Sequence, residues 1–161
     1  MKKIIVLLLL IVNVPILANS HDKIEQIVQS GNEPFGVVFE LVEGNKEAWE
    51  WAGPLLKNHT DTLRKKYPDI AIAIVSHGFE QFQLTKSSAQ TNQNSINILT
   101  ELVNQQNADL HVCGTHSSWY QVPEDGYIDI VDVAISGPAK INDYLNLDYQ
   151  LVKISQTNAL H

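Results

Sequence analysis

Short apolar runs of strand length alternate with segments of helical periodicity along most of this 161-residue chain. β-branched and aromatic residues dominate the runs, and turn-forming residues such as Gly, Pro and Asn end them, which is typical of strands. Strands that alternate with helices in this way indicate βαβ units and a mostly parallel sheet with helices on both faces. We therefore expect a three-layer α/β/α, flavodoxin-like domain whose five strands cover 35–41, 70–76, 108–113, 130–135 and 149–154.

Apolar residues at helical spacing predict the helices that join these strands. Gly53-Pro54 falls inside the first helical pattern, and because proline lacks a backbone N–H we expect it to kink or divide that helix. Pro138 suits the first turn of the last helix. Residues 79–93 are expected to form a long, Gln- and Ser-rich connection, and residues 117–128 an irregular one. Helices are expected at 48–63, 94–106 and 138–145, with a weaker one at 22–29 inside a short N-terminal linker.

The N-terminal residues have the features of a cleavable export signal. Lys2 and Lys3 give a positive start, and residues 4–12 form an apolar run that is shorter than the roughly 20 residues that span a bilayer. Small residues at Ala18-Asn19-Ser20 allow cleavage near Ser20/His21, and an uncleaved anchor fits these flanks less well. We therefore expect an exported, periplasmic protein without stable membrane insertion. The expected divisions are a signal peptide (1–20), a short helix and linker (21–34), one α/β domain (35–155) and a C-terminal tail (156–161).

Composition and charge exclude several classes of protein. The 18 acidic residues outnumber 11 Lys and Arg and are spread along the chain, so the basic surface that nucleic-acid binding requires is not expected. No G-x-G-x-x-G or Walker loop for a nucleotide occurs. The single cysteine, Cys113, excludes an intramolecular disulfide, an all-cysteine zinc site and a protein-held iron–sulfur cluster. We expect no cofactor and no metal.

The only thiol and two histidines fall at the predicted ends of neighbouring strands. Ligands of open α/β sheets bind beyond the carboxyl ends of the strands, so Cys113, His77 and His116 are expected at one edge. His111 lies two residues before Cys113 and therefore on the same face of its strand. The predicted site has Cys113 as its reactive residue and a pocket formed by His77, Gly78, His111, Gly114, Thr115, His116, Ser136 and Gly137.

A thiol at such an edge has a defined chemistry. Histidines and a helix N-terminus give a positive potential that favours the thiolate, and Gly114 is expected to let the chain turn sharply and leave the sulfur uncovered. Attack on a sulfur donor would leave a persulfide on Cys113 that no second cysteine resolves, which is the behaviour of a sulfur carrier. The opposing interpretation is a buried and inert cysteine.

Two other chemistries use the same residues. His77, His111 and His116 with Cys113 are potential ligands of zinc or copper, but Cys-x-x-His is only half of the usual ligand spacing. A Cys–His hydrolase, with His77 or His116 as the base, ranks lower than the carrier. The neighbouring loops carry large aromatic side chains that either pack against the domain or cover a pocket: Phe79, Phe82, Trp119 and Tyr120.

Four segments together resemble the DsrE/DsrF-like (DsrE/TusD-related) family: 35–41, 74–78, 111–116 and 131–139. The resemblance spans 35–154, and its most specific parts are Cys113-Gly114-Thr115-His116 and Ser136-Gly137-Pro138-Ala139. It implies a flavodoxin-like domain that forms homo-oligomers and relays persulfide sulfur, in sulfur oxidation or tRNA thiolation, with Cys113 in the position of the active cysteine.

The export signal departs from the cytoplasmic relays of that family, so tRNA thiolation is not expected here. The sequence predicts an exported carrier, or sulfurtransferase-like relay, whose partner is a sulfur donor or acceptor protein or a small sulfur compound. The alternative is a non-catalytic binding or assembly module, accessory to a periplasmic redox or sulfur-metabolism protein, in which Cys113 is merely packed.

Overall fold

A computed structural model describes residues 19–156, so the predicted leader lies outside the described residues except for Asn19 and Ser20. Five strands form one sheet in the order β4-β3-β2-β1-β5, and every pair is parallel. The α/β/α prediction is therefore confirmed, and β2 is the central strand. The strands are β1 (Gly36–Leu41), β2 (Ala71–Ser76), β3 (Ala108–Cys113), β4 (Asp132–Ala134) and β5 (Tyr149–Ile154).

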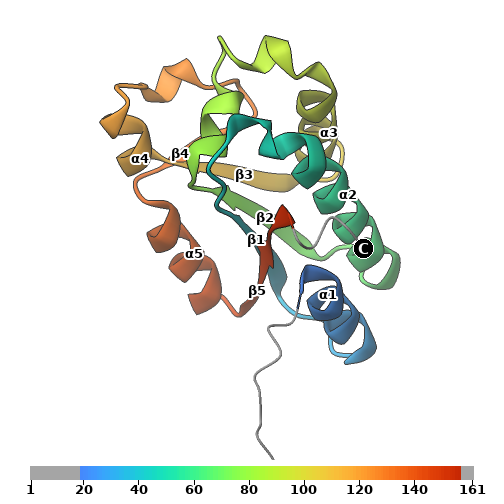
Figure 1. Ribbon diagram of the computed structural model, residues 1–161. Coiled ribbons are helices and arrows are strands. Elements are labelled where there is room, and N and C mark those ends of the chain that lie inside the picture. The colour runs from blue at the N-terminus through green and yellow to red at the C-terminus, as the bar shows by residue number, and fades with distance from the viewer. Residues whose placement is uncertain (1–18, 157–161) are drawn as a thin grey trace, which may run out of the picture.

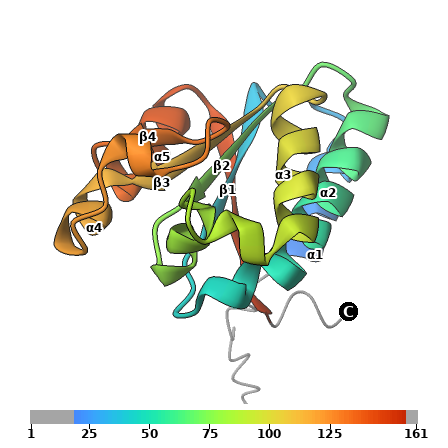
Figure 2. The same cartoon turned by 90° about the horizontal axis from the view of Figure 1, so that it is seen from above.

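Helices cover both faces of the sheet (Figure 1). Figure 2 shows α1 (Ser20–Gln29), α2 (Trp49–Lys66) and α3 (Gln93–Asn104) on one side and α5 (Gly137–Asn146) on the other. The short helix α4 (Gly114–Trp119) follows β3 directly. Within residues 19–156, none of the helices combines the length and the apolar character needed to cross a bilayer.

The larger part of the core lies between the sheet and α1, α2 and α3. Phe39 on β1, Trp49 on α2 and Leu99 on α3 are fully buried there. Val38, also on β1, faces the other way and packs with Ile141 and Tyr144 of α5. Because β1 is covered on both faces, its sequence is a continuous apolar run rather than an alternating one. Each such buried side chain stabilises the fold by about 1.5–3 kcal/mol.

Helix α2 runs unbroken through Gly53-Pro54, so the predicted division is wrong. The helix begins at Trp49, which places Pro54 in its second turn, where the ring removes one backbone hydrogen bond. The buried face formed by Ala52, Leu56 and other residues of the helix packs on the core and offsets that loss.

Helix α1 is part of the domain rather than a linker before it. Ile24 and Ile27 are buried in the main core. The Asn19 side chain caps the helix by accepting a 2.9 Å hydrogen bond from the backbone N–H of Asp22. Ser20, at the predicted cleavage position, is buried in the first turn. The domain therefore extends beyond the predicted start at residue 35.

The long connection at 79–93 and the connection at 117–128, which was predicted to be irregular, both contain short helical turns. Residues 79–93 include η2 (Phe79–Leu84) and η3 (Ala89–Thr91), and residues 117–128 include the end of α4 and η4 (Glu124–Gly126). A further 3-10 turn, η1 (Lys46–Ala48), leads into α2.

Strand β4 is much shorter than the predicted strand at 130–135. The backbone N–H of Val131 donates to Ile128 O at 3.0 Å and closes a turn, which removes the first residues of the predicted strand from the sheet. Only Asp132–Ala134 pair with β3, and they form an edge of the sheet.

Candidate site around Cys113

Cys113 is the last residue of β3 and lies where the sequence analysis placed it, at the carboxyl edge of the sheet. Leu110 and Val112 of the same strand belong to the core beneath α2 and α3. Side chains alternate along a strand, so His111 and Cys113 face the α5 side. The thiol is free of any disulfide and buried, with 6% of the residue exposed.

Gln81, which the sequence analysis missed, holds the backbone of Cys113. Its Oε1 accepts a hydrogen bond from the Cys113 N–H at 2.9 Å, and its Nε2 lies 3.4 Å from Cys113 O. Ser117 Oγ donates to the same carbonyl at 2.8 Å. Gln81 is completely buried, so these bonds form in a water-poor environment where losing them is costly. The main chain at the thiol is therefore fixed.

The sulfur itself accepts the backbone N–H of His116, with N and Sγ 3.4 Å apart. The sulfur thus occupies the cap position at the start of α4. In general, a peptide N–H directed at a cysteine sulfur favours the thiolate, and the thiolate is the form of cysteine that attacks other sulfur atoms. The histidine that contacts the thiol does so through its backbone and not through its ring.

His77 follows β2 and is turned toward β1. Its Nε2 lies 3.0 Å from Glu40 Oε1, and Lys153 Nζ lies 3.4 Å from the other oxygen of Glu40. Gly137, at the start of α5, packs directly on the His77 side chain. No hydrogen bond joins the His77 ring to Cys113 in the described part of the chain. The structure brings His77 to the predicted edge but pairs it with a carboxylate.

Replacement of Gly137 by alanine is expected to lower the free energy of unfolding by about 1–3 kcal/mol. The new Cβ would lie 2.5 Å from His77 Cβ and 2.9 Å from its Cγ, so His77 must move away from Glu40. Urea denaturation measures the effect.

Gly53→Ala is the matched control. The nearest atoms to its Cβ are those of Ile98 at 3.9 Å, so this helical position has room for alanine. Because the residue precedes Pro54, the usual gain of a Gly-to-Ala change in a helix is reduced, and the variant is expected to stay within about 0.5 kcal/mol of the wild type. Equal stability of the Gly137→Ala variant and the wild type would show that the packing of His77 on α5 is unimportant.

The ring of His116 lies in an aromatic cluster made by the loops on either side of the thiol. Its Nδ1 donates to His77 O at 3.1 Å. Its ring centroid lies 5.2 Å from that of Phe82 and 5.4 Å from those of Trp119 and Tyr120. Phe79 joins through Phe82 and Tyr120. The four predicted loop aromatics therefore pack together, while Trp119 remains 71% exposed.

His111 is buried and lies apart from the predicted edge, inside a chain of hydrogen bonds. Tyr144 of α5 donates to Asp109 Oδ2 at 3.0 Å, and its oxygen lies 2.8 Å from His111 Nε2. Burial lowers the pKa of His111, and the positive charge of Lys140 acts in the same direction. Burial also raises the pKa of Tyr144. His111 is therefore neutral and held by Tyr144 rather than by Cys113.

The remaining predicted residues shape the backbone of the edge. Thr115 Oγ1 donates to Ile135 O at 2.7 Å and ties α4 to the end of β4. The chain passes directly from β3 into α4 at Gly114, without a positive φ. Cys113 is buried, so the expectation that this turn leaves the sulfur uncovered is wrong. A Cβ at Gly114 would lie 3.0 Å from Ala134 O, and close packing on β4 is the reason for glycine there. Ser136 precedes α5, and Gly78 follows His77 in a position too tight for a Cβ.

Glu80 is a second buried residue that the sequence analysis missed. Its Oε1 accepts from Ser76 Oγ at 2.7 Å and from Gly78 N–H at 3.0 Å. Its Oε2 accepts from Glu43 N–H at 2.7 Å, so one carboxylate joins the loops after β1 and β2. Burial raises the pKa of Glu80. A glutamate in a Gln-rich loop carried no sequence signal for this role.

The three histidines and Cys113 do not meet as a ligand set. Among residues 19–156, no three His, Cys, Asp or Glu side chains form a group that could hold a metal ion. The hydrolase hypothesis requires an imidazole at the sulfur, and no hydrogen bond joins the ring of His77 or His116 to Sγ within the described residues.

Comparisons with known proteins bear on the fold. No protein-family model and no curated protein sequence matches this chain. The chain is similar to the solved structure of MTH1491 from Methanobacterium thermoautotrophicum, which is described as a protein of unknown function. The TM-score is 0.59 and the sequence identity is 19%. The match covers 74% of this chain and 99% of MTH1491. At this identity the likeness shows the α/β fold alone, and this chain therefore shares its fold with MTH1491.

Proposed function

We propose that this protein is an exported, DsrE-like sulfur carrier in which Cys113 accepts sulfane sulfur and passes it on. The observation that carries the proposal is the hydrogen bond from His116 N–H to Sγ, at a strand end whose backbone Gln81 and Ser117 hold in place. This arrangement directs a peptide N–H at the sulfur and fixes the sulfur at the edge where open α/β sheets bind their ligands.

The chemistry needs no cofactor and no net oxidation. The Cys113 thiolate attacks the outer sulfur of a persulfide donor, the donor's S–S bond breaks, and the donor leaves as a thiolate. A new S–S bond then joins the transferred sulfur to Cys113. An acceptor thiolate repeats the step on the outer sulfur and regenerates Cys113. No second cysteine exists in the chain to intercept the sulfur between these two steps.

The exported location rests on the N-terminal sequence. Lys2, Lys3 and the apolar run at 4–12 have the order of a signal peptide. The intact mass of the protein from the periplasm of an expression host tests this part, because removal of the leader shortens the chain by about 20 residues.

Sulfur loading tests the carrier. The purified protein is treated with glutathione persulfide, and intact-mass and peptide spectra are recorded. We expect one added sulfur atom on Cys113 and its release to an added thiol. Cys113→Ser is the negative control. If the native protein takes up no sulfur, while the unfolded protein is alkylated at Cys113, the carrier proposal is overturned.

A binding or assembly module is the second candidate, and exposed apolar side chains favour it. Ile135 is 91% exposed directly after β4, Trp119 at the end of α4 is 71% exposed, and Tyr120, which follows α4, is 54% exposed. Apolar side chains grouped beside a buried thiol are typical of an interaction surface. Homo-oligomers, which the DsrE resemblance implies, would cover them. Sedimentation of wild type against Ile135→Asp distinguishes an assembly surface from a monomer with exposed aromatics.

A further inference from the structure

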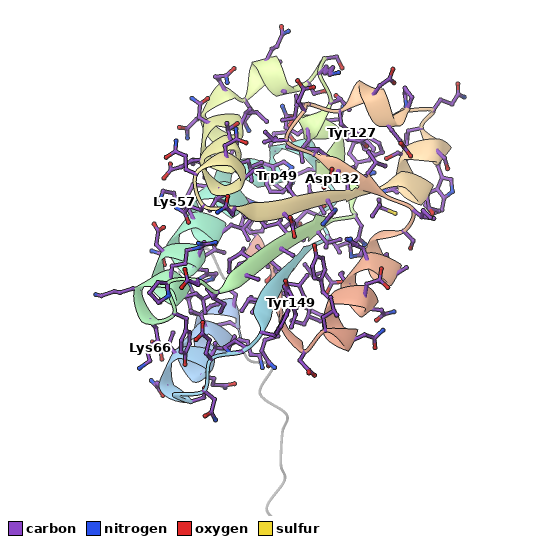
Figure 3. The ribbon with its side chains drawn as sticks, turned by 180° about the vertical axis from the view of Figure 1, so that it is seen from behind. Trp49, Lys57, Lys66, Tyr127, Asp132 and Tyr149 are labelled. Carbon is purple, nitrogen blue, oxygen red and sulfur yellow. The ribbon has the colours of Figure 1, made fainter. Side chains whose placement is uncertain are left out.

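A groove of about 680 Å³ runs between strand β4 and helix α5. Ala134, Ile135 and Ala139 give it apolar walls. Asp132 of β4, which Figure 3 labels, also lines it. Small-molecule sites are concave spaces of roughly 300–1,000 Å³ with a few convergent polar groups. The groove has the size and the mixed lining of such a site.

The groove opens on the same face of the sheet as the thiol. His111 lines it, and Cys113 lies two residues further along the same strand and face. Cys113 is paired in register with Ala134, which also lines the groove. Two residues of strand span about 7 Å. A small molecule held at His111 is therefore within reach of the sulfur.

His111 presents an unpaired acceptor to this groove. The Tyr144 hydroxyl donates its hydrogen to Asp109, so its oxygen must accept the hydrogen on His111 Nε2. In a neutral imidazole the other nitrogen then carries a lone pair. Nδ1 of His111 has no hydrogen-bond partner within residues 19–156, although only 5% of the residue is exposed. Nδ1 is not one of the fully buried side-chain atoms that lack a partner, so a ligand or water in the groove can reach it and donate a hydrogen bond to it.

The charged groups around His111 define the ligand further. The groove is lined by three carboxylates, from Glu124, Asp132 and Asp143, and by one ammonium, from Lys140. None of the four forms an ion pair with another described residue. The carboxylates and the His111 lone pair all accept hydrogen bonds, and Lys140 is the single cation. A ligand that carries both an ammonium and a carboxylate complements this set.

We propose that the groove binds the sulfur donor as an α-amino-acid persulfide, the persulfide of cysteine. The ammonium of the donor is bound by His111 and the carboxylates, its carboxylate faces Lys140, and its outer sulfur reaches Cys113. This inference rests on the proposed carrier function. Transfer forms the S–S bond on Cys113, breaks the S–S bond of the donor and releases cysteine as its thiolate.

Loading rates with two matched donors test the assignment. Cysteine persulfide and N-acetylcysteine persulfide differ by the ammonium group, and we expect the first to load Cys113 about tenfold faster, the effect of one charge-assisted contact. Asp132→Asn with Asp143→Asn is expected to reduce this preference to about twofold or less. Glu50→Gln, at an exposed position of α2 on the opposite face, is expected to keep it.

Binding without chemistry keeps the two proposals separable. In the full chain with Cys113→Ser, S-methylcysteine is expected to shift the amide resonances of Ala134 and Ala139, and S-methyl-N-acetylcysteine is expected to leave them in place. Equal loading by both persulfides together with no shift would overturn the groove assignment and leave the carrier proposal intact. A shift without any sulfur loading in the wild type would support the groove ligand and overturn the carrier.

Discussion

Replacement of Glu80 by alanine is expected to lower the free energy of unfolding by about 3 kcal/mol. The change leaves the Ser76 hydroxyl and the backbone N–H groups of Gly78 and Glu43 without their acceptor. Each buried donor left unsatisfied costs about 1–3 kcal/mol, and removing a carboxylate that burial disfavours offsets part of the sum. Urea denaturation at neutral pH measures the difference.

Two further variants separate the hydrogen bonds from general effects of substitution. Glu80→Gln keeps one acceptor oxygen and is expected to lose less stability than the alanine variant. Glu50→Ala, on the exposed side of α2, is expected to stay within about 0.5 kcal/mol of the wild type. A Glu80→Ala protein as stable as Glu50→Ala would contradict the role of Glu80 in joining the two loops.

Lowering the pH from about 6.5 to about 4 is expected to reduce the free energy of unfolding, and the contribution of His59 to this loss is about 3 kcal/mol. This side chain is 1% exposed, its Nε2 lies 2.9 Å from Ser20 Oγ, and its ring stacks on Phe39. Burial, helped by the positive charge of His21, lowers the pKa of His59 to about 4.

The sign follows from proton binding. Between pH 6.5 and about 4 the unfolded chain binds a proton at His59 that the folded protein does not bind, so stability is full above pH 6.5 and is lost as pH falls toward 4. His111, whose pKa is also lowered, contributes with the same sign. Glu80 contributes with the opposite sign, because burial raises its pKa and acidification favours its folded form.

Comparison with His59→Gln isolates this histidine, because the other groups contribute equally to both proteins. The free energy of unfolding is measured by urea denaturation at several values between pH 4 and pH 7. The difference in the free energy of unfolding between the wild type and the variant is expected to change by about 3 kcal/mol across that range. If this difference in the free energy of unfolding is the same at every pH, the pKa of His59 is not lowered in the folded protein.

Local sequence patterns predicted most of the fold. The strands at 108–113 and 149–154 match the structure at both ends, because an apolar run between turn-forming residues has few alternatives. The prediction for 130–135 was less accurate because a turn at Ile128 and Val131 competes with strand pairing. The predicted division of the helix at Gly53-Pro54 was wrong because the core contacts of α2 outweigh the local preference of proline.

The site was predicted only in part. The positions of Cys113, His77 and His116 at one edge follow from strand ends in a parallel sheet, and the structure places them there. The directions of the imidazole rings do not follow from position. The structure pairs His77 with Glu40 and places the His116 ring against aromatic side chains instead of the sulfur.

The sequence by itself determined the class of fold, the sharing of one face of a strand by His111 and Cys113, and the edge of the sheet at which the thiol lies. These features follow from strand periodicity and from the parallel arrangement, which depend on local residue type. Only the tertiary structure decided what surrounds the sulfur. Gln81 and Glu80 come from the loop after β2, and Ala134 comes from β4, so their contacts with the site depend on strand order and loop path. No spacing along the chain encodes those contacts, since they form between segments that only the assembled core brings together.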